Sequence, residues 1–143
     1  MSILHSFLGG ITMEYMDIPQ EELKQRLTEE EYKVTQEKGT EAPFTGKYVN
    51  EHARGKYSCK VCGTELFASD NKFDSGTGWP SFDQAIHGAV KMLIDTSHGM
   101  TRTEVTCAKC GAHLGHMFED GPKETTCQRF CINSVALDLK KDE

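Results

Sequence analysis

The segment from Arg129 to Ser134, RFCINS, places a cysteine between an arginine and an asparagine. If the segment is a β-strand, the alternation of side chains puts Arg129, Cys131 and Asn133 on one face. A guanidinium next to a thiol favours the thiolate, which is the nucleophilic form of cysteine, and an amide can orient the group that the sulfur attacks. The segment therefore predicts a catalytic cysteine. The alternative is a structural cysteine in a buried β-strand.

Four other cysteines form two CxxCG units. Each unit is a tight turn in which two sulfurs converge, and the glycine after the second cysteine allows the backbone conformation that such a turn often needs. Four thiolates are a preferred tetrahedral ligand set for Zn²⁺. We predict a closed, structural zinc site that fastens the chain near Tyr57 to the chain near Thr106, with the ligands Cys59, Cys62, Cys107 and Cys110.

Two alternatives to this site are open. A thioredoxin-like CxxC motif would need a βαβ context, which the sequence lacks. Cys107, Cys110, His113 and His116 lie at a constant spacing of three and could bind a metal alone, but the first cysteine pair would then have no role. The four-cysteine site leaves both histidines free for chemistry. Because residues three apart point to opposite faces of a regular strand, both histidines reach one pocket only if Gly115 marks a bulge or bend.

The composition limits the size of the protein and its partners. A chain of 143 residues is long enough for one domain, and its net charge of -6 disfavours nucleic acid and anionic membrane surfaces as partners. Residues 1–16 are mildly apolar but too short and too interrupted for a membrane span or a signal sequence. We interpret them as an N-terminal arm before a single domain of residues 17–143. The absence of a signal sequence and the contexts of the cysteines predict a cytoplasmic location.

Two short helices are expected before a β-rich region. Asp17 is a possible cap and Pro19 lies in the first turn of the first helix. Thr28 and Glu31 form a capping box for the second helix, and Gly39 is a suitable stop. The rest of the chain contains short β-type runs separated by glycines, at residues 57–61, 65–68, 89–95, 103–106, 114–118 and 130–139. The pattern predicts a mainly β fold with helices in front.

Several motifs of the chain resemble those of the methionine-R-sulfoxide reductases, the B-type class. They are KFDSG at 72–76, GWPSF at 78–82, HLGHMF at 113–118, DGP at 120–122 and RFCINS at 129–134. The resemblance spans nearly everything from Leu23 to Leu139. It implies two antiparallel sheets with N-terminal helices and a four-cysteine zinc site away from the catalytic centre. It also implies repair of oxidised proteins and peptides during oxidative stress, by thiol-dependent reduction of the R epimer of methionine sulfoxide.

The same resemblance makes Cys131 the nucleophile and surrounds it with Trp79, His113, His116, Phe118, Arg129 and Asn133. A histidine can supply a proton to the departing sulfoxide oxygen, and the cysteine ends as a sulfenic acid. An aromatic wall such as Trp79 suits the methyl end of the substrate, although a lone tryptophan in a glycine-rich loop is often a core residue. A wall and a proton donor on fixed sides would accept only one epimer.

The chain departs from the family pattern at Thr77, where many members have a resolving cysteine. Cys127 is the only uncommitted thiol. In an extended chain it would lie about 13 Å from Cys131, which is too far for a disulfide, so a bridge requires the segment from Thr125 to Gln128 to be a turn or to rearrange after catalysis. We predict that Cys127 resolves the sulfenic acid and that a thioredoxin-type reductant then reduces the disulfide. Direct reduction of the sulfenic acid by an external thiol is the alternative.

Two other classes of function also use paired CxxC units. One is a non-catalytic, zinc-clamped β module that binds a protein or a hydrophobic peptide, and the other is a zinc ribbon that binds nucleic acid. A pure binding module has no need for the set of residues around Cys131, and the acidic net charge argues against a nucleic-acid partner. The sequence therefore favours an enzyme, expected to act as a monomer on oxidised proteins or peptides.

Overall fold

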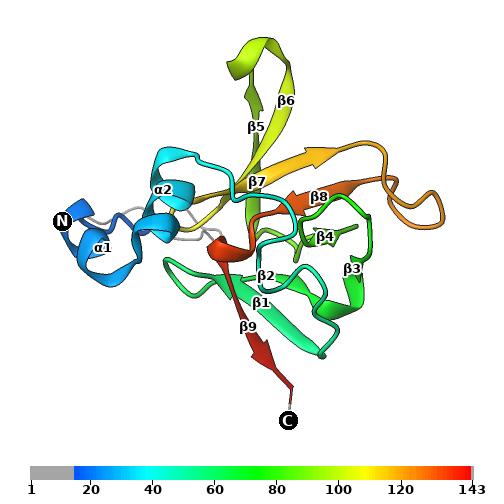
Figure 1. Cartoon of the computed structure of the whole chain (residues 1–143), viewed down its shortest axis with the longest axis horizontal. Coiled ribbons are helices and arrows are strands. Elements are labelled where there is room, and N and C mark those ends of the chain that lie inside the picture. Colours follow the sequence, from blue (N-terminus) through cyan, green and yellow to red (C-terminus); the bar gives the residue numbers. More distant parts are fainter. Residues whose placement is uncertain (1–14, 143) are drawn as a thin grey trace, which may run out of the picture.

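Two antiparallel β-sheets form most of the protein, as Figure 1 shows for a computed structural model that describes residues 15–142. The smaller sheet has the strand order β2-β1-β9, with β1 (Gly55–Cys59), β2 (Glu65–Ala68) and β9 (Leu137–Lys141). The larger sheet has the order β3-β4-β8-β7-β6-β5. Its strands are β3 (Lys72–Phe73), β4 (Ser81–Phe82), β5 (Val90–Asp95), β6 (Arg102–Cys107), β7 (His113–Phe118) and β8 (Arg129–Ile132). The predicted mainly β fold with two antiparallel sheets is confirmed.

From residue 15 onward, two helices precede the sheets, α1 (Gln20–Arg26) and α2 (Glu29–Glu37). The capping box of α2 is confirmed, with the Glu31 amide donating to the Thr28 hydroxyl at 3.1 Å and the Thr28 amide to the Glu31 carboxylate at 2.9 Å. The predicted cap of α1 is wrong, because Pro19 itself occupies the N-cap position and Asp17 lies outside it. The left-handed residue that ends α2 is Lys38, at φ 58°, and Gly39 follows it.

The hydrophobic core lies between the two sheets. Tyr57 of β1 and Phe67 of β2 contact Phe82 of β4, with ring centroids 5.2 and 4.4 Å apart. Phe67 also contacts Phe130 of β8, at 5.8 Å. Because side chains alternate along a strand, the burial of Phe130 directs the neighbouring Cys131 to the opposite face of the larger sheet.

At the C-terminal end the sequence pattern predicted one strand where the structure has two, β8 and β9. The run predicted at 130–139 is broken by a helical turn, Ser134–Ala136, so that β8 joins the larger sheet and β9 the smaller one. The turn forms because the Glu41 carboxylate accepts the backbone N–H groups of Ser134 and Val135, at 2.9 and 3.0 Å. The two-residue strands β3 and β4 were not predicted, since alternation cannot be recognised over two residues.

Residues 1–14 of the predicted N-terminal arm lie outside the described residues. The last two arm residues contact the second CxxC unit, where the Met16 amide donates to the carbonyl of Lys109 at 2.6 Å and the Tyr15 hydroxyl to that of Cys110 at 3.2 Å. Across residues 15–142, none of the helices has the length and apolar character needed to span a bilayer. The division into an arm and a single domain stays a prediction.

Candidate active site

Cys131 lies in the middle of the larger sheet. The strand register places it opposite Ser81 of β4 on one side and opposite His116 of β7 on the other, and His116 is in turn opposite Glu104 of β6. Directly paired residues project from the same face of a sheet. A thiol, an imidazole and a carboxyl group therefore form one row on the face turned away from the aromatic core.

A cleft of about 230 Å³ opens over this part of the sheet. It combines the partly exposed Cys131 with two aromatic rings, two guanidinium groups and an imidazole. The structure thus brings together all of the predicted pocket residues except His113. The cleft is lined by Thr40, Thr77, Trp79, Arg102, Gly115, His116, Phe118, Arg129, Cys131 and Asn133.

A β-bulge in β7 changes the spacing of the two histidines. Thr106 pairs with His113 and the preceding residue of β6 pairs with Gly115, so Leu114 is an extra residue. This bulge turns the rings of His113 and His116 toward each other, with their centroids 5.5 Å apart. A Cβ atom at Gly115 would overlap the carbonyl oxygen of Cys131, so only glycine allows β7 to approach β8 this closely. The bulge that the sequence required for the two histidines to approach each other is thus present, although only His116 lines the cleft.

The two histidines have different surroundings. His113 is only 3% exposed, its Nδ1 lies 2.8 Å from a Glu104 carboxyl oxygen, and its buried Nε2 has no hydrogen-bond partner among the described residues. Burial lowers the pKa of His113, although the neighbouring Glu104 opposes the change.

His116 lies at the cleft, and its Nε2 is 2.9 Å from a carboxylate oxygen of Asp95. Bonds from the hydroxyl and amide of Ser97, and then from His116, hold the pKa of Asp95 well below its usual range. Asp95 therefore remains a carboxylate that orients the cleft histidine, a contact that the sequence did not predict.

Arg129 lines the cleft and also forms an ion pair with Asp120. Its Nε and Nη2 donate to the two Asp120 oxygens at 2.8 and 3.2 Å, and its guanidinium lies 4.5 Å from the centre of the Phe118 ring. Burial of the sulfur raises the pKa of Cys131 above its ordinary value. Arg129, as expected, and the Thr77 hydroxyl act in the opposite direction and favour the thiolate, but burial is the larger effect.

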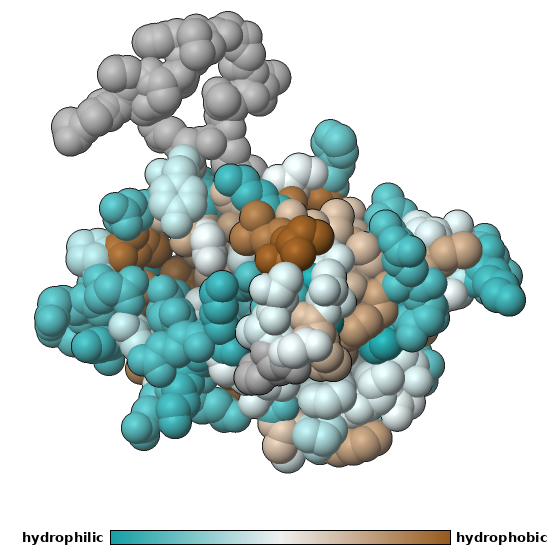
Figure 2. All heavy atoms as spheres, turned by 90° about the horizontal axis from the view of Figure 1, so that it is seen from above, coloured by the Kyte–Doolittle hydropathy of each residue, from teal (hydrophilic) through white to brown (hydrophobic). Residues whose placement is uncertain are grey.

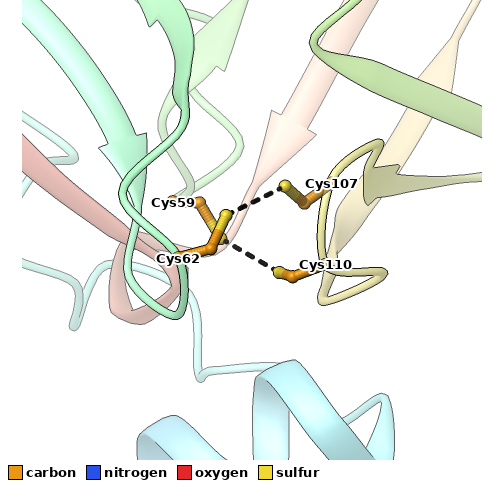
Figure 3. Close-up of side chains that lie close together, drawn as sticks. All are labelled: Cys59, Cys62, Cys107 and Cys110. Atoms are coloured by element: carbon orange, nitrogen blue, oxygen red, sulfur yellow. Dashed lines mark hydrogen bonds between the residues drawn. The ribbon is translucent and has the colours of Figure 1, made fainter. Parts of the chain in front are cut away.

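The four CxxC cysteines form a separate cluster between the two sheets (Figure 3). Their ligand atoms all lie within 4.8 Å of one another, and the sulfurs of Cys62 and Cys107 are 3.6 Å apart, with those of Cys59 and Cys110 at 3.7 Å. A tetrahedral site with Zn–S bonds of about 2.3 Å requires sulfurs about 3.8 Å apart, so the geometry fits a four-thiolate metal centre. Cys59 ends β1 and Cys107 ends β6, and a bound metal would join the two sheets at this point.

Comparison with known proteins places the chain in a family. Residues 27–141 match the family model described as the SelR domain. The chain is 54% identical to the peptide methionine sulfoxide reductase MsrB of Chromohalobacter salexigens over 123 residues, which is 85% of this chain and 92% of the relative. The chain belongs to the methionine-R-sulfoxide reductase (MsrB) family. The MsrB protein of Thioalkalivibrio sulfidiphilus is 53% identical over 86% of this chain and 90% of the relative, and that of Acinetobacter baylyi is 54% identical over 85% and 88%.

In this MsrB chain, Glu41 connects two walls of the cleft. Its backbone carbonyl accepts the indole N–H of Trp79 at 3.0 Å, and its backbone N–H donates to Oδ1 of Asn133, also at 3.0 Å. The Asn133 amide group donates in turn to the carbonyl of Leu114 at 2.9 Å. No pattern in the sequence indicates this role, because the contacts use backbone atoms of Glu41 and join residues far apart in the chain.

Cys127 of this MsrB chain lies outside the cleft lining. It is exposed, has a left-handed backbone with φ 63°, and donates its N–H to the carbonyl of Pro122 at 2.9 Å. Residues 123–126 form a turn directly before it. The turn precedes Cys127, and Cys131 lies in β8, so a disulfide between Cys127 and Cys131 requires the segment between them to rearrange.

Proposed function

We propose that this protein reduces methionine-R-sulfoxide in peptides and proteins to methionine, with a thiol as the electron donor. Membership of the MsrB family supports this function. The observation that carries it is the cleft itself, where a partly exposed cysteine lies directly opposite a histidine and next to a tryptophan. A β module that only binds peptides would not need this combination.

In the proposed reaction, the sulfur of Cys131 attacks the sulfoxide sulfur. The attack forms a transient S–S bond, and the proton of the thiol is transferred to the sulfoxide oxygen. The resulting hydroxyl group then moves from the substrate sulfur to the Cys131 sulfur, so the S–O bond of the substrate and the transient S–S bond both break, Cys131 becomes a sulfenic acid and methionine leaves. The thiol is thereby oxidised by two electrons and the sulfoxide is reduced by two. His116 is placed to carry the proton, because it lies opposite the thiol and is oriented by Asp95. The buried His113, bonded to Glu104, supports the His116 ring from behind and is proposed as a positioning residue.

The remaining cleft residues are proposed to bind the substrate. Trp79 and Phe118 provide an apolar wall for the methyl group, and Arg129 and Asn133 provide donors for the polar end. Because wall and donors have fixed positions, only one arrangement of methyl group and oxygen about the chiral sulfur fits the cleft.

The function is tested with separated R and S epimers of a methionine sulfoxide peptide and dithiothreitol as the reductant. We expect the R epimer to be converted to methionine and the S epimer to remain unchanged, as measured by chromatography of the products. Conversion of neither epimer by a folded, metal-loaded protein would refute the proposed activity and favour the peptide-binding module.

For recycling, we propose that Cys127 attacks the sulfenic acid of Cys131, which forms a disulfide and releases water, and that a thioredoxin-type protein then reduces the disulfide. The exposure of Cys127 supports this step, which requires the segment between Cys127 and β8 to rearrange after catalysis. In Cys127→Ser, we expect a persistent sulfenic acid at Cys131, detectable by mass spectrometry after dimedone labelling. Turnover with thioredoxin should fall about tenfold or more. Unimpaired turnover would instead support direct reduction by an external thiol.

The metal at the four-cysteine cluster is proposed to be Zn²⁺, because a closed set of four thiolates is typical of structural zinc. We also propose that the protein acts as a monomer, since a single chain supplies all the residues lining the described cleft. A reducing compartment such as the cytoplasm would keep the thiols reduced and supply the thiol donor.

A further inference from the structure

The hairpin of β5 and β6 extends away from the body of the protein (Figure 1) and carries unusual surface residues. Three successive residues of β5 have large exposed hydrophobic side chains, with exposures of 47% for Met92, 48% for Leu93 and 72% for Ile94. Met100, just before β6, is 51% exposed. Figure 2, which views the molecule from the side of the hairpin, shows a hydrophobic area within a mostly hydrophilic surface. Exposed apolar clusters of this kind commonly mark binding surfaces.

The apolar residues lie along a free strand edge. Among the strands formed by residues 15–142, β5 is the last strand of the larger sheet and pairs only with β6. Alternation places Met92 and Ile94 on one face of β5 and Leu93 on the other, so the edge is apolar on both sides. Proteins usually protect such an edge with charges, prolines or a cover. The charged residues of β5, Lys91 and Asp95, lie on either side of its three apolar residues, which leaves the central part of the edge able to pair with an additional strand.

The edge of β5 is continuous with the cleft. Leu93 is paired with Glu104, which is paired with His116, the residue opposite Cys131. At the end of the same strand, Asp95 contacts His116 and also pairs with Arg102, a cleft residue. A ligand on the β5 edge would therefore lie on the sheet that forms the floor of the cleft.

We propose that the outer edge of β5 binds an extended segment of the substrate polypeptide, next to the oxidised methionine in the cleft. This inference rests on the proposed function. A segment paired with the outer edge of β5 would lie four strand spacings of about 4.8 Å from β8, or about 19 Å in total. An extended chain covers this distance in about six residues. The residues that reach the edge are thus about six positions or more from the oxidised methionine, and apolar side chains among them would cover those of β5.

The test compares a small and a long substrate. The small one is N-acetyl-methionine-R-sulfoxide methylamide, and the long one is a 19-residue peptide with one central methionine-R-sulfoxide and apolar residues at positions six to nine on either side. The variants are Ile94→Asp and Met92→Asp. The control is Asn50→Asp, which adds the same charge at an exposed position before β1. All are assayed with dithiothreitol, and circular dichroism checks folding.

We expect the wild type to use the long peptide with a higher kcat/KM than the small substrate. Both hairpin variants should lower kcat/KM for the long peptide about fivefold or more, because a charge replaces apolar contact area, and leave the small substrate unchanged. The Asn50→Asp variant should match the wild type. If Ile94→Asp lowers kcat/KM for both substrates equally, because the new charge disturbs its neighbour Asp95, the kcat/KM values of Met92→Asp decide whether the edge binds the long peptide.

Three results would overturn the proposal. The first is equal use of both substrates by the wild type, and the second is normal use of the long peptide by folded Ile94→Asp and Met92→Asp proteins. The third is a wild-type dimer in analytical ultracentrifugation that Ile94→Asp dissociates without a change in peptide kinetics, because the edge would then bind a second copy of the chain. Reduction of neither substrate by the wild type overturns the proposed function as well, so the two failures can be distinguished.

Discussion

Replacing Cys131 with serine is expected to abolish methionine-R-sulfoxide reduction, with a loss in kcat of about 10⁴-fold or more. A serine hydroxyl is a far weaker nucleophile than a thiolate, and its oxygen cannot be oxidised to a sulfenic acid, so it has no electrons to give to the substrate. The fold should be retained, because serine has nearly the size of cysteine and Cys131 is only partly buried. Release of methionine in a single turnover without added reductant measures the loss directly.

The matched control is Cys127→Ser, which should release about one equivalent of methionine per chain because Cys131 is still present. In the wild type, alkylation of Cys131 by iodoacetamide should continue to accelerate as the pH rises through 9. Burial raises the pKa of this thiol above its ordinary value of 9.0, so the fraction of thiolate is still increasing at that pH. A folded Cys131→Ser protein that still released methionine would show that another group is the nucleophile.

Removal of the metal is expected to have the largest effect on stability. In Cys62→Ala, or after treatment with a strong chelator, we expect the melting temperature to fall by about 10 °C or more. The metal would join Cys59 at the end of β1 to Cys107 at the end of β6, so its loss releases one sheet from the other. Differential scanning calorimetry measures the change, and elemental analysis should find one zinc ion per wild-type chain.

Cys127→Ala is the control for the metal experiment. It also removes one cysteine, but from an exposed turn away from the cluster, so the zinc content and the melting temperature should match those of the wild type. An unchanged melting temperature for metal-free Cys62→Ala would mean that the aromatic core alone holds the two sheets together.

Local sequence patterns predicted much of the fold. The capping box at Thr28 follows from two residues three apart, and the exposed and buried positions of β8 follow from simple alternation. The pattern could not show where one strand ended and the next began after Asn133. That break depends on the carboxylate of Glu41, which binds the turn from more than 90 residues earlier in the chain.

For the site, the residues that can do chemistry were recognisable in the sequence: the four cysteines of the metal cluster, Cys131 and the histidines near it. Spacing and residue type are sufficient here, because tight CxxC turns and strand alternation are local properties. The folded structure was needed to place His116 at the cleft with Asp95 and to bury His113 with Glu104, and the burial that raises the pKa of Cys131 arises there too. These outcomes depend on strand register, burial and contacts between distant segments, which are fixed when the sheets pack together and leave no periodic pattern in the chain.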